Sequence, residues 1–237
     1  GPDKLIVRKI TGTNGQILIQ MRVGLGILQM EWSDRPDGKR PHGKSSLLVH
    51  YQEQLKKQAA EHGPDTQLNL TQADCMNLQS ESLQYYYRRS CMFELEAYHE
   101  ASRDAEHNLQ IMDMILAHAE NENDRLSFDQ YRPFVIMHRT RARSLLAMGD
   151  DNIDDAIHHI QEGIEEIETF FRSYDRNDLL KDSQEHKLLR DKAEELLKQQ
   201  PLSEEDLLKS KLTEAVENEE FERAAALRDE LKKYGLH

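Results

Sequence analysis

The sequence is poor in cysteine, proline, glycine and aromatic residues. Its 237 residues include two cysteines, six prolines and 11 glycines, and aromatic residues make up 6%. Together with a charged fraction of 32%, this composition is typical of a soluble, mainly helical protein. Cys75 and Cys91 fall on one predicted helix, about 24 Å apart along its axis, so they cannot pair with each other. We therefore expect a reducing, cytoplasmic compartment.

Two further deficits limit the partners. The chain has 31 Lys and Arg residues against 44 Asp and Glu residues, which gives a formal net charge of −13 at pH 7. Such a surface repels phosphate backbones, so direct binding of nucleic acid is not expected. The sequence also lacks a run of about 18 apolar residues, so we expect no membrane-spanning helix. Its length suffices for one large domain, or for a domain with an appendage.

Common catalytic and metal-binding motifs are missing as well. The sequence has no HExxH, CxxC or GxSxG pattern, which removes the usual basis for a metalloprotease, a redox pair or a serine hydrolase. Glu96 with His99, and Asp155 with His158, each have the spacing of half a di-metal site in a helical bundle. Both pairs fall at predicted turns, where side chains would not converge inward. We therefore expect no metal site and no cofactor.

What is present begins with three short β-rich segments. Asn14-Gly15 separates the first two and is a strong hairpin signal. Alternation along the second segment places Ile17, Ile19, Met21 and Val23 on one face. The pattern predicts a small antiparallel meander that packs one face on helices, because three strands alone are only marginally stable. The segments are residues 5–10, 16–23 and 26–32.

Residues 34–45, DRPDGKRPHGKS, support two interpretations. Gly38, Gly43, Lys44 and Ser45 match the spacing of a phosphate-binding P-loop. A P-loop also requires a parallel sheet and an acidic residue after a second buried strand, and no strand pattern follows Ser45. We therefore favour a polar turn built on residues 36–38, with Ser45 as the N-cap of the next helix.

The same loop is the densest basic patch of the chain. An anionic ligand or an acidic partner segment is the alternative to an ordinary solvated loop at this position. The candidate anion-binding residues are Arg35, Lys39, Arg40 and Lys44.

Residues 45–200 have a nearly continuous helical pattern. Gly63-Pro64 interrupts it, and Thr71 restarts it with Asp74 in a capping box. Pro133 is expected to kink or to start a helix. Within this region residues 85–113 resemble a tetratricopeptide unit, on the turn Leu95-Glu96-Ala97-Tyr98 followed by Ala101, Ala105 and Leu109. A second stretch is similar, on Ala142, Leu145, Met148 and Gly149 followed by Ile153, Ala156, Ile160, Gly163 and Ile164.

The resemblance implies a TPR-like antiparallel bundle of long helical hairpins. The sequence departs from the family pattern in three ways: Glu96 stands where the turn glycine would fall, residues 150–152 are extra, and the spacing of Ala101 and Ala156 is far from the period of about 34 residues. The resemblance also implies that the first helix of each unit lines a groove. The inward positions would be Tyr86, Ser90, Phe93, Arg139, Arg143 and Leu146.

Two arginines stand out among these positions. Arg139 and Arg143 are one helical turn apart and would suit a peptide that bears a carboxylate, because Arg binds carboxylate through two parallel hydrogen bonds. The alternative is that they pair with the Glu-rich helix that follows, at Glu162, Glu165, Glu166 and Glu168. The run of residues 85–89, YYYRR, resembles a stacking platform for bases. Consecutive residues spread around a helix, however, which favours a central core helix.

The C-terminal residues 212–231, LTEAVENEEFERAAALRDEL, predict a helical hairpin. Leu208, Leu212, Ala215 and Val216 recur at helical spacing, Asn218-Glu219-Glu220 interrupts them, and Phe221, Ala224, Leu227, Leu231 and Tyr234 resume the pattern. Pro201 and the predicted N-cap Ser203, with Asp206 three residues on and Leu202 against Leu207, mark the start of the first helix. Asn218 is expected to cap the second. A pair of such short helices buries too little surface to stand firmly alone.

These residues resemble a known module. Ala215-Val216-Glu217, Glu220-Phe221-Glu222, Ala224-Ala225 and Leu227-Arg228-Asp229 resemble the UVR motif of the bacterial excision-repair proteins UvrB and UvrC, which is also found in McsA and ClpC-type stress proteins. The resemblance implies a hairpin that docks on another UVR hairpin or on a partner protein and performs no chemistry. Its partner-binding residues would be Phe221, Ala224, Leu227, Arg228 and Leu231.

The sequence therefore predicts a mainly α protein in three parts: a β meander with a basic loop (1–44), a TPR-like helical bundle (45–200) and a UVR-type hairpin (201–237). The predicted function is that of a cytoplasmic bacterial adaptor or scaffold without enzymatic activity, in DNA repair or in proteolysis and stress control. Its partner would be a protein, including another UVR hairpin, and a homo-oligomer is compatible with this. The alternative is a P-loop-type nucleotide- or phosphate-binding protein that uses the loop 38–45.

Overall fold

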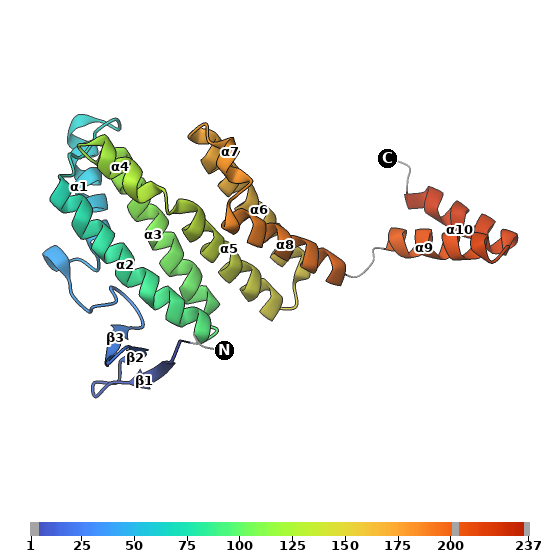
Figure 1. Cartoon of the computed structure of the whole chain (residues 1–237), viewed down its shortest axis with the longest axis horizontal. Coiled ribbons are helices and arrows are strands. Elements are labelled where there is room, and N and C mark those ends of the chain that lie inside the picture. The colour runs from blue at the N-terminus through green and yellow to red at the C-terminus, as the bar shows by residue number, and fades with distance from the viewer. Residues whose placement is uncertain (1–4, 201–203, 235–237) are drawn as a thin grey trace. The chain divides into compact units, whose positions relative to one another are not determined.

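The computed structural model describes residues 5–200 and 204–234, with the side chains of 5–200 and 207–232 (Figure 1). The chain divides into two compact units, Gly1–Glu194 and Glu195–His237. It is mainly helical, with a small antiparallel sheet near the N-terminus and two further helices near the C-terminus, which confirms the predicted fold class. The predicted cap at Ser203, the packing of Leu202 and the side chain of Tyr234 lie outside the described residues.

The sheet is the predicted meander, with strand order β1-β2-β3 and both pairs antiparallel. Ile19 pairs with Lys9 on one side and Met30 on the other. Ile19 and Met21 are buried in a core that includes Met92 of the helical region, so the sheet packs one face on helices as expected. Only the middle of that face is buried, since the two end positions of the predicted stripe are exposed. The strands are β1 (Val7–Thr11), β2 (Ile17–Val23) and β3 (Gly26–Glu31).

The helices of the long region follow one another as neighbours. α2 packs on α3, α3 on α5 and α5 on α6. Figure 1 shows α2, α3 and α5 side by side. Pro133 lies in the first turn of α5, where its missing N–H costs nothing. A short 3₁₀ turn, η1 (Pro41–Gly43), precedes the first helix. The helices are α1 (Leu47–His62), α2 (Gln72–Glu94), α3 (Tyr98–His118), α4 (Glu122–Asp129), α5 (Arg132–Gly149), α6 (Ile153–Ser173), α7 (Asn177–Leu180) and α8 (Gln184–Gln199).

Side-chain caps fix where two of these helices begin. At α2 the backbone N–H of Thr71 donates to Asp74 Oδ2 at 3.0 Å, and the N–H of Asp74 donates to Thr71 Oγ1 at 3.3 Å, so the capping box is present. The N-cap of α1 is Ser46 and not the predicted Ser45, because the N–H of Val49 donates to Ser46 Oγ at 3.1 Å.

Four helices end in one shared geometry without glycine. After α2, Glu96 takes a left-handed conformation (φ +56°) and the N–H of Ala97 donates to the carbonyl of Met92 at 2.9 Å. The same hydrogen bond, from a backbone N–H to the carbonyl five residues earlier, recurs after α5, α6 and α9. This is the Schellman motif, whose left-handed position is usually glycine. The acidic residues in that position are Glu96, Asp151, Asp175 and Glu219.

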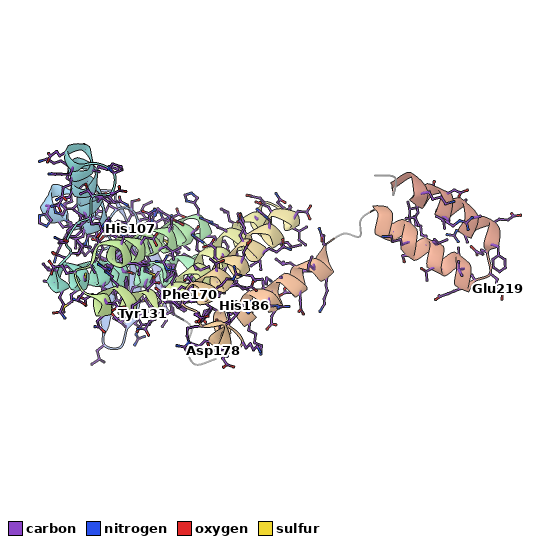
Figure 2. All side chains as sticks on the ribbon, turned by 90° about the horizontal axis from the view of Figure 1, so that it is seen from above. His107, Tyr131, Phe170, Asp178, His186 and Glu219 are labelled. Carbon is purple, nitrogen blue, oxygen red and sulfur yellow. The ribbon has the colours of Figure 1, made fainter. Side chains whose placement is uncertain are left out.

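The C-terminal unit contains the predicted hairpin, formed by α9 (Glu204–Glu217) packed on α10 (Phe221–Tyr234). Figure 2 labels Glu219 at the turn between the two helices. The prediction that Asn218 caps the second helix is wrong. The N–H of Asn218 still donates to the carbonyl of Glu214, so this residue completes α9, and Glu220 occupies the position before α10.

Helices α5 and α6 approach each other closely at Gly163. A Cβ atom added to Gly163 would lie 2.1 Å from Thr140 Oγ1 and 2.6 Å from Thr140 Cγ2. Thr140 is buried and β-branched, so it has little freedom to move aside. Glycine is therefore required for the contact between these two helices.

We predict that Gly163→Ala lowers the free energy of unfolding by about 1–3 kcal/mol through overpacking, despite the higher helix propensity of alanine. Urea unfolding followed by circular dichroism measures the change. Gly149→Ala is the matched control, because a Cβ at Gly149 has no neighbour within 4 Å. The control should be neutral or slightly stabilising, and equal behaviour of the two variants would contradict the assigned contact.

Candidate interaction surfaces

The C-terminal hairpin has an interior built from alanine and an exposed apolar surface. Ala215 and Ala224 are buried, which lets α9 and α10 approach closely. Phe221, at the first position of α10, is 70% exposed, and Val216 at the end of α9 is 53% exposed. Large apolar side chains are thus left in solvent at the turn end of the hairpin, where they are available to a partner.

The five predicted partner-binding residues of the hairpin do not share one environment. Phe221 and Arg228 are exposed, while Leu227 and Leu231 are half-buried. Ala224 faces the seam between the two helices, so it packs the hairpin and is not available to a partner. The predicted stripe is therefore divided between the internal seam and the outer surface of the hairpin.

The loop before α1 is held by a buried carboxylate. Glu81, on α2, has no exposed surface. Its Oε2 accepts from the N–H of Leu47 at 2.8 Å, and its Oε1 accepts from the N–H of Leu48 at 3.2 Å. Arg35 and His107 contact the same carboxylate at 3.2 Å each. An internal carboxylate therefore occupies the N-terminus of α1, the position where a P-loop would hold phosphate.

The basic residues of this loop are mostly compensated from within the chain. Arg35 also pairs with Asp37 at 3.0 Å, and Arg40 approaches Asp34 at 3.3 Å. Lys44 pairs with Glu53, in the second turn of α1. The predicted turn is present, since the N–H of Gly38 donates to the carbonyl of Arg35 at 2.9 Å with φ +69° at the glycine. Lys39 is exposed on this turn.

A second buried charge fixes the start of the same loop. Arg88 is 1% exposed and donates to both oxygens of Asp104 on α3, at 2.7 and 2.8 Å. Its Nη1 also donates to the carbonyls of Glu31, Ser33 and Asp34, at 3.1, 3.3 and 2.8 Å. This one side chain therefore joins α2 to α3 and holds the chain where it leaves β3.

The sequence did not predict the residues of this network. One signal was present: Glu81, Tyr85, Arg88 and Met92 follow the three- and four-residue spacing of the buried face of α2. Charges on an apolar stripe indicate buried ion pairs. The partner Asp104 on another helix could not be identified from spacing alone.

The predicted groove residues do not share one surface, because Tyr86 of α2 contacts the other side of α5 from Arg139 and Arg143. Arg139 is 8% exposed, and its Nη1 donates to Glu106 on α3 at 3.0 Å while its Nη2 donates to Glu166 on α6 at 2.5 Å. Arg143 approaches Glu106 at 3.4 Å. Pairing with the Glu-rich helix is therefore the arrangement observed for Arg139, and Glu106 was not anticipated. Both arginines are engaged by carboxylates of the same chain.

Tyr86 lies on the opposite side of α5 from these arginines. Its ring contacts Phe134, with 5.9 Å between the ring centroids, and the guanidinium carbon of Arg89 lies 5.6 Å from the centroid of Tyr86. The structure thus places Tyr86 in the seam between α2 and α5, apart from Arg139 and Arg143. It does not bring the three together in one groove.

His138 occupies this α2–α5 seam. Its ring lies 4.3 Å from that of Phe134 and 5.5 Å from that of Phe93, measured between centroids. Burial lowers the pKa of His138 to about 3, and the charges of Arg89 and Arg141 contribute to the same effect. His138 is therefore neutral in the folded protein around neutral pH.

The cysteines are free and buried. Burial raises the pKa of Cys75 and of Cys91 to about 11, so both remain thiols and are unreactive. Within residues 5–200 and 204–234, no group of three His, Cys, Asp or Glu side chains is placed to hold a metal ion. No helix in the same described segments is long and apolar enough to cross a membrane.

The described elements define a mainly helical protein with a C-terminal helical hairpin. The family model of the UVR (UvrB/uvrC) motif matches residues 206–235, so the hairpin is a UVR motif and the protein carries one. Neither a curated protein nor a solved structure matches the chain.

We predict that His138 contributes to acid destabilisation. Its pKa is lower in the folded protein than the ordinary value of about 6.5, so the unfolded chain binds more protons between about pH 6.5 and pH 3. The stabilisation that the neutral His138 contributes to the folded state is complete above about pH 6.5. As the pH falls through this window, the free energy of unfolding decreases by at most about 1.4 kcal/mol per pH unit. Urea unfolding at several pH values measures this slope. His138→Gln should flatten it, whereas the exposed control His99→Gln should leave it unchanged; an unchanged slope in His138→Gln would refute the assignment.

Proposed function

We propose that this protein is a non-enzymatic adaptor that recruits a partner protein through its UVR hairpin. The observation that carries the proposal is the exposure of Phe221, an aromatic side chain at 70% exposure inside the matched motif. Monomeric proteins do expose single apolar residues, but here Val216 and Leu207 of the same hairpin are exposed as well. The proposed setting is the bacterial cytoplasm, in DNA repair or in proteolysis and stress control.

The architecture of the hairpin supports a docking role. Its helices close on small residues, so the interior that stabilises it is small while larger side chains remain outside. Burial of a side chain such as Phe221 at an interface contributes about 1.5–3 kcal/mol. A partner, including a second UVR hairpin, would therefore stabilise the hairpin and gain affinity through the same contact.

We also propose that the loop 38–45 does not bind nucleotide. Two contacts support this. The carboxylate of Glu81 receives the N–H groups at the start of α1, and Lys44 pairs with Glu53. A phosphate at this position would meet a buried negative charge and would have to displace it, at a cost of several kcal/mol.

Phe221→Ala should reduce recovery of the partner by about ten-fold or more, because a loss of about 1.4 kcal/mol corresponds to a factor of ten. Affinity capture from an extract of the native host, quantified by mass spectrometry, measures this. Met76→Ala is the matched control, since Met76 is 62% exposed on α2 and lies outside the motif. A chain ending at Gln200 provides the background without the hairpin. A partner captured equally by Phe221→Ala and by the intact chain would show that the hairpin is not the docking site.

Calorimetric titration with ATP and Mg²⁺ should give no binding signal for the intact chain, because the anion position at α1 is filled by Glu81. The comparison uses Lys44→Ala and, as its control in the same loop, Lys39→Ala. A micromolar affinity that Lys44→Ala abolishes and Lys39→Ala retains would establish the nucleotide-binding alternative instead.

A further inference from the structure

The helical unit Gly1–Glu194 contains a depression of two neighbouring parts on the side of α6 that includes Phe170, which Figure 2 labels. One part is a groove of about 610 Å³ between α3, α5 and α6. The other is a hollow of about 570 Å³ lined by residues of α4, α6 and α7 and by residues at the starts of α5 and α8. Phe170 and Tyr174 border both volumes, so the groove and the hollow are neighbours on either side of these two residues.

The groove is strongly acidic. Arg132 and Arg139 are the cations of its lining, and each already lies between two carboxylates. Arg143 only touches one of these carboxylates from outside the lining, at 3.4 Å. Glu165 is exposed and has no ion-pair partner in the described part of the chain. The six carboxylates of the lining are Glu106, Asp113, Asp129, Glu162, Glu165 and Glu166.

The hollow is mainly apolar. Leu126 and Leu179 reach into it with 43% and 40% of their surfaces exposed, and Phe171 and Pro133 lie in its wall. The polar residues of the lining are Gln130, Arg176, Asp182, Ser183 and Glu185, and Arg176 pairs with Asp178. Tyr174 marks the boundary between the two parts, because its hydroxyl donates to Asp129 Oδ2 at 2.6 Å while its ring borders the hollow. A side chain of the size of Leu or Phe would be desolvated here.

We propose that this depression binds an extended, basic segment of a partner protein, with one large apolar side chain in the hollow at Leu179 and with Lys or Arg residues along the groove at Glu165. Charge complementarity selects this occupant: six carboxylates against two arginines give the groove lining an excess of negative charge, which attracts cations and repels both acidic peptides and nucleic acid. The sign is opposite to that suggested by Arg139 and Arg143 in the sequence, since both arginines are engaged internally. The site belongs to the unit Gly1–Glu194 and the UVR hairpin to the other unit, so the site provides a second docking surface.

Fluorescence anisotropy with the full chain tests the proposal. The probe is a labelled peptide with a single Leu flanked by Lys and Arg, compared with the same peptide carrying Glu at the flanking positions and with one carrying Ser in place of Leu. The basic peptide with Leu should bind, and the other two should bind at least about ten-fold more weakly. Glu165→Arg and Leu179→Asp should each weaken binding of the basic peptide by about ten-fold, and both residues are exposed enough to be replaced without unfolding the chain.

Glu61→Arg is the control for charge, because it makes the same change at an exposed position on α1, away from the groove. It should leave the affinity unchanged. Equal losses in Glu165→Arg and Glu61→Arg would mean that the acidic chain attracts the peptide without a specific site, and would overturn the proposal. Preference for the acidic peptide, or no binding of the basic peptide at about millimolar concentration, would overturn it as well.

Discussion

The buried ion pair between Arg88 and Asp104 is the interaction on which the arrangement of the N-terminal half depends. Both side chains are withdrawn from water, at 1% and 0% exposure, so each charge requires the other. Arg88 uses its remaining N–H groups on three backbone carbonyls, and the nearby Glu81 receives two backbone N–H groups at the start of α1. One face of α2 thus satisfies backbone polar groups at both ends of the segment that connects β3 to α1. The sheet and α1 are held in place from this helix.

The same surface of α2 also determines whether the loop with the P-loop-like spacing can bind an anion. A helix N-terminus attracts an anion through its free N–H groups and its dipole. At α1 that anion is Glu81 of the protein itself. The P-loop-like spacing of Gly, Lys and Ser therefore corresponds to a turn and a helix start in this chain. The carboxylate of Glu81 accepts the hydrogen bonds that a phosphate would otherwise accept.

The two proposed docking surfaces differ in the interaction that would hold a partner. The UVR hairpin offers exposed apolar side chains on a module that buries Ala215 and Ala224 between its helices, so affinity there would come mainly from apolar burial. The groove of α3, α5 and α6 offers an excess of carboxylates beside an apolar hollow, which favours selection by charge. A protein with two such surfaces is suited to bring different partners together.

The sequence alone determined the local structure of this protein. Alternation and Asn14-Gly15 gave the meander, the Thr71–Asp74 capping box gave the start of α2, and the motif at residues 215–229 gave the hairpin, because each depends on residues close together in the chain. The helix-closing turns were less evident, since acidic residues take the left-handed position that glycine usually occupies.

Only the tertiary structure decided which charges meet. Arg139 and Arg143 had the spacing of a carboxylate clamp, yet Glu106 and Glu166 reach them from other helices, and Tyr86 turns to the opposite face of α5. Spacing within one helix fixes the direction of a side chain, whereas its partner is fixed by how separate helices pack.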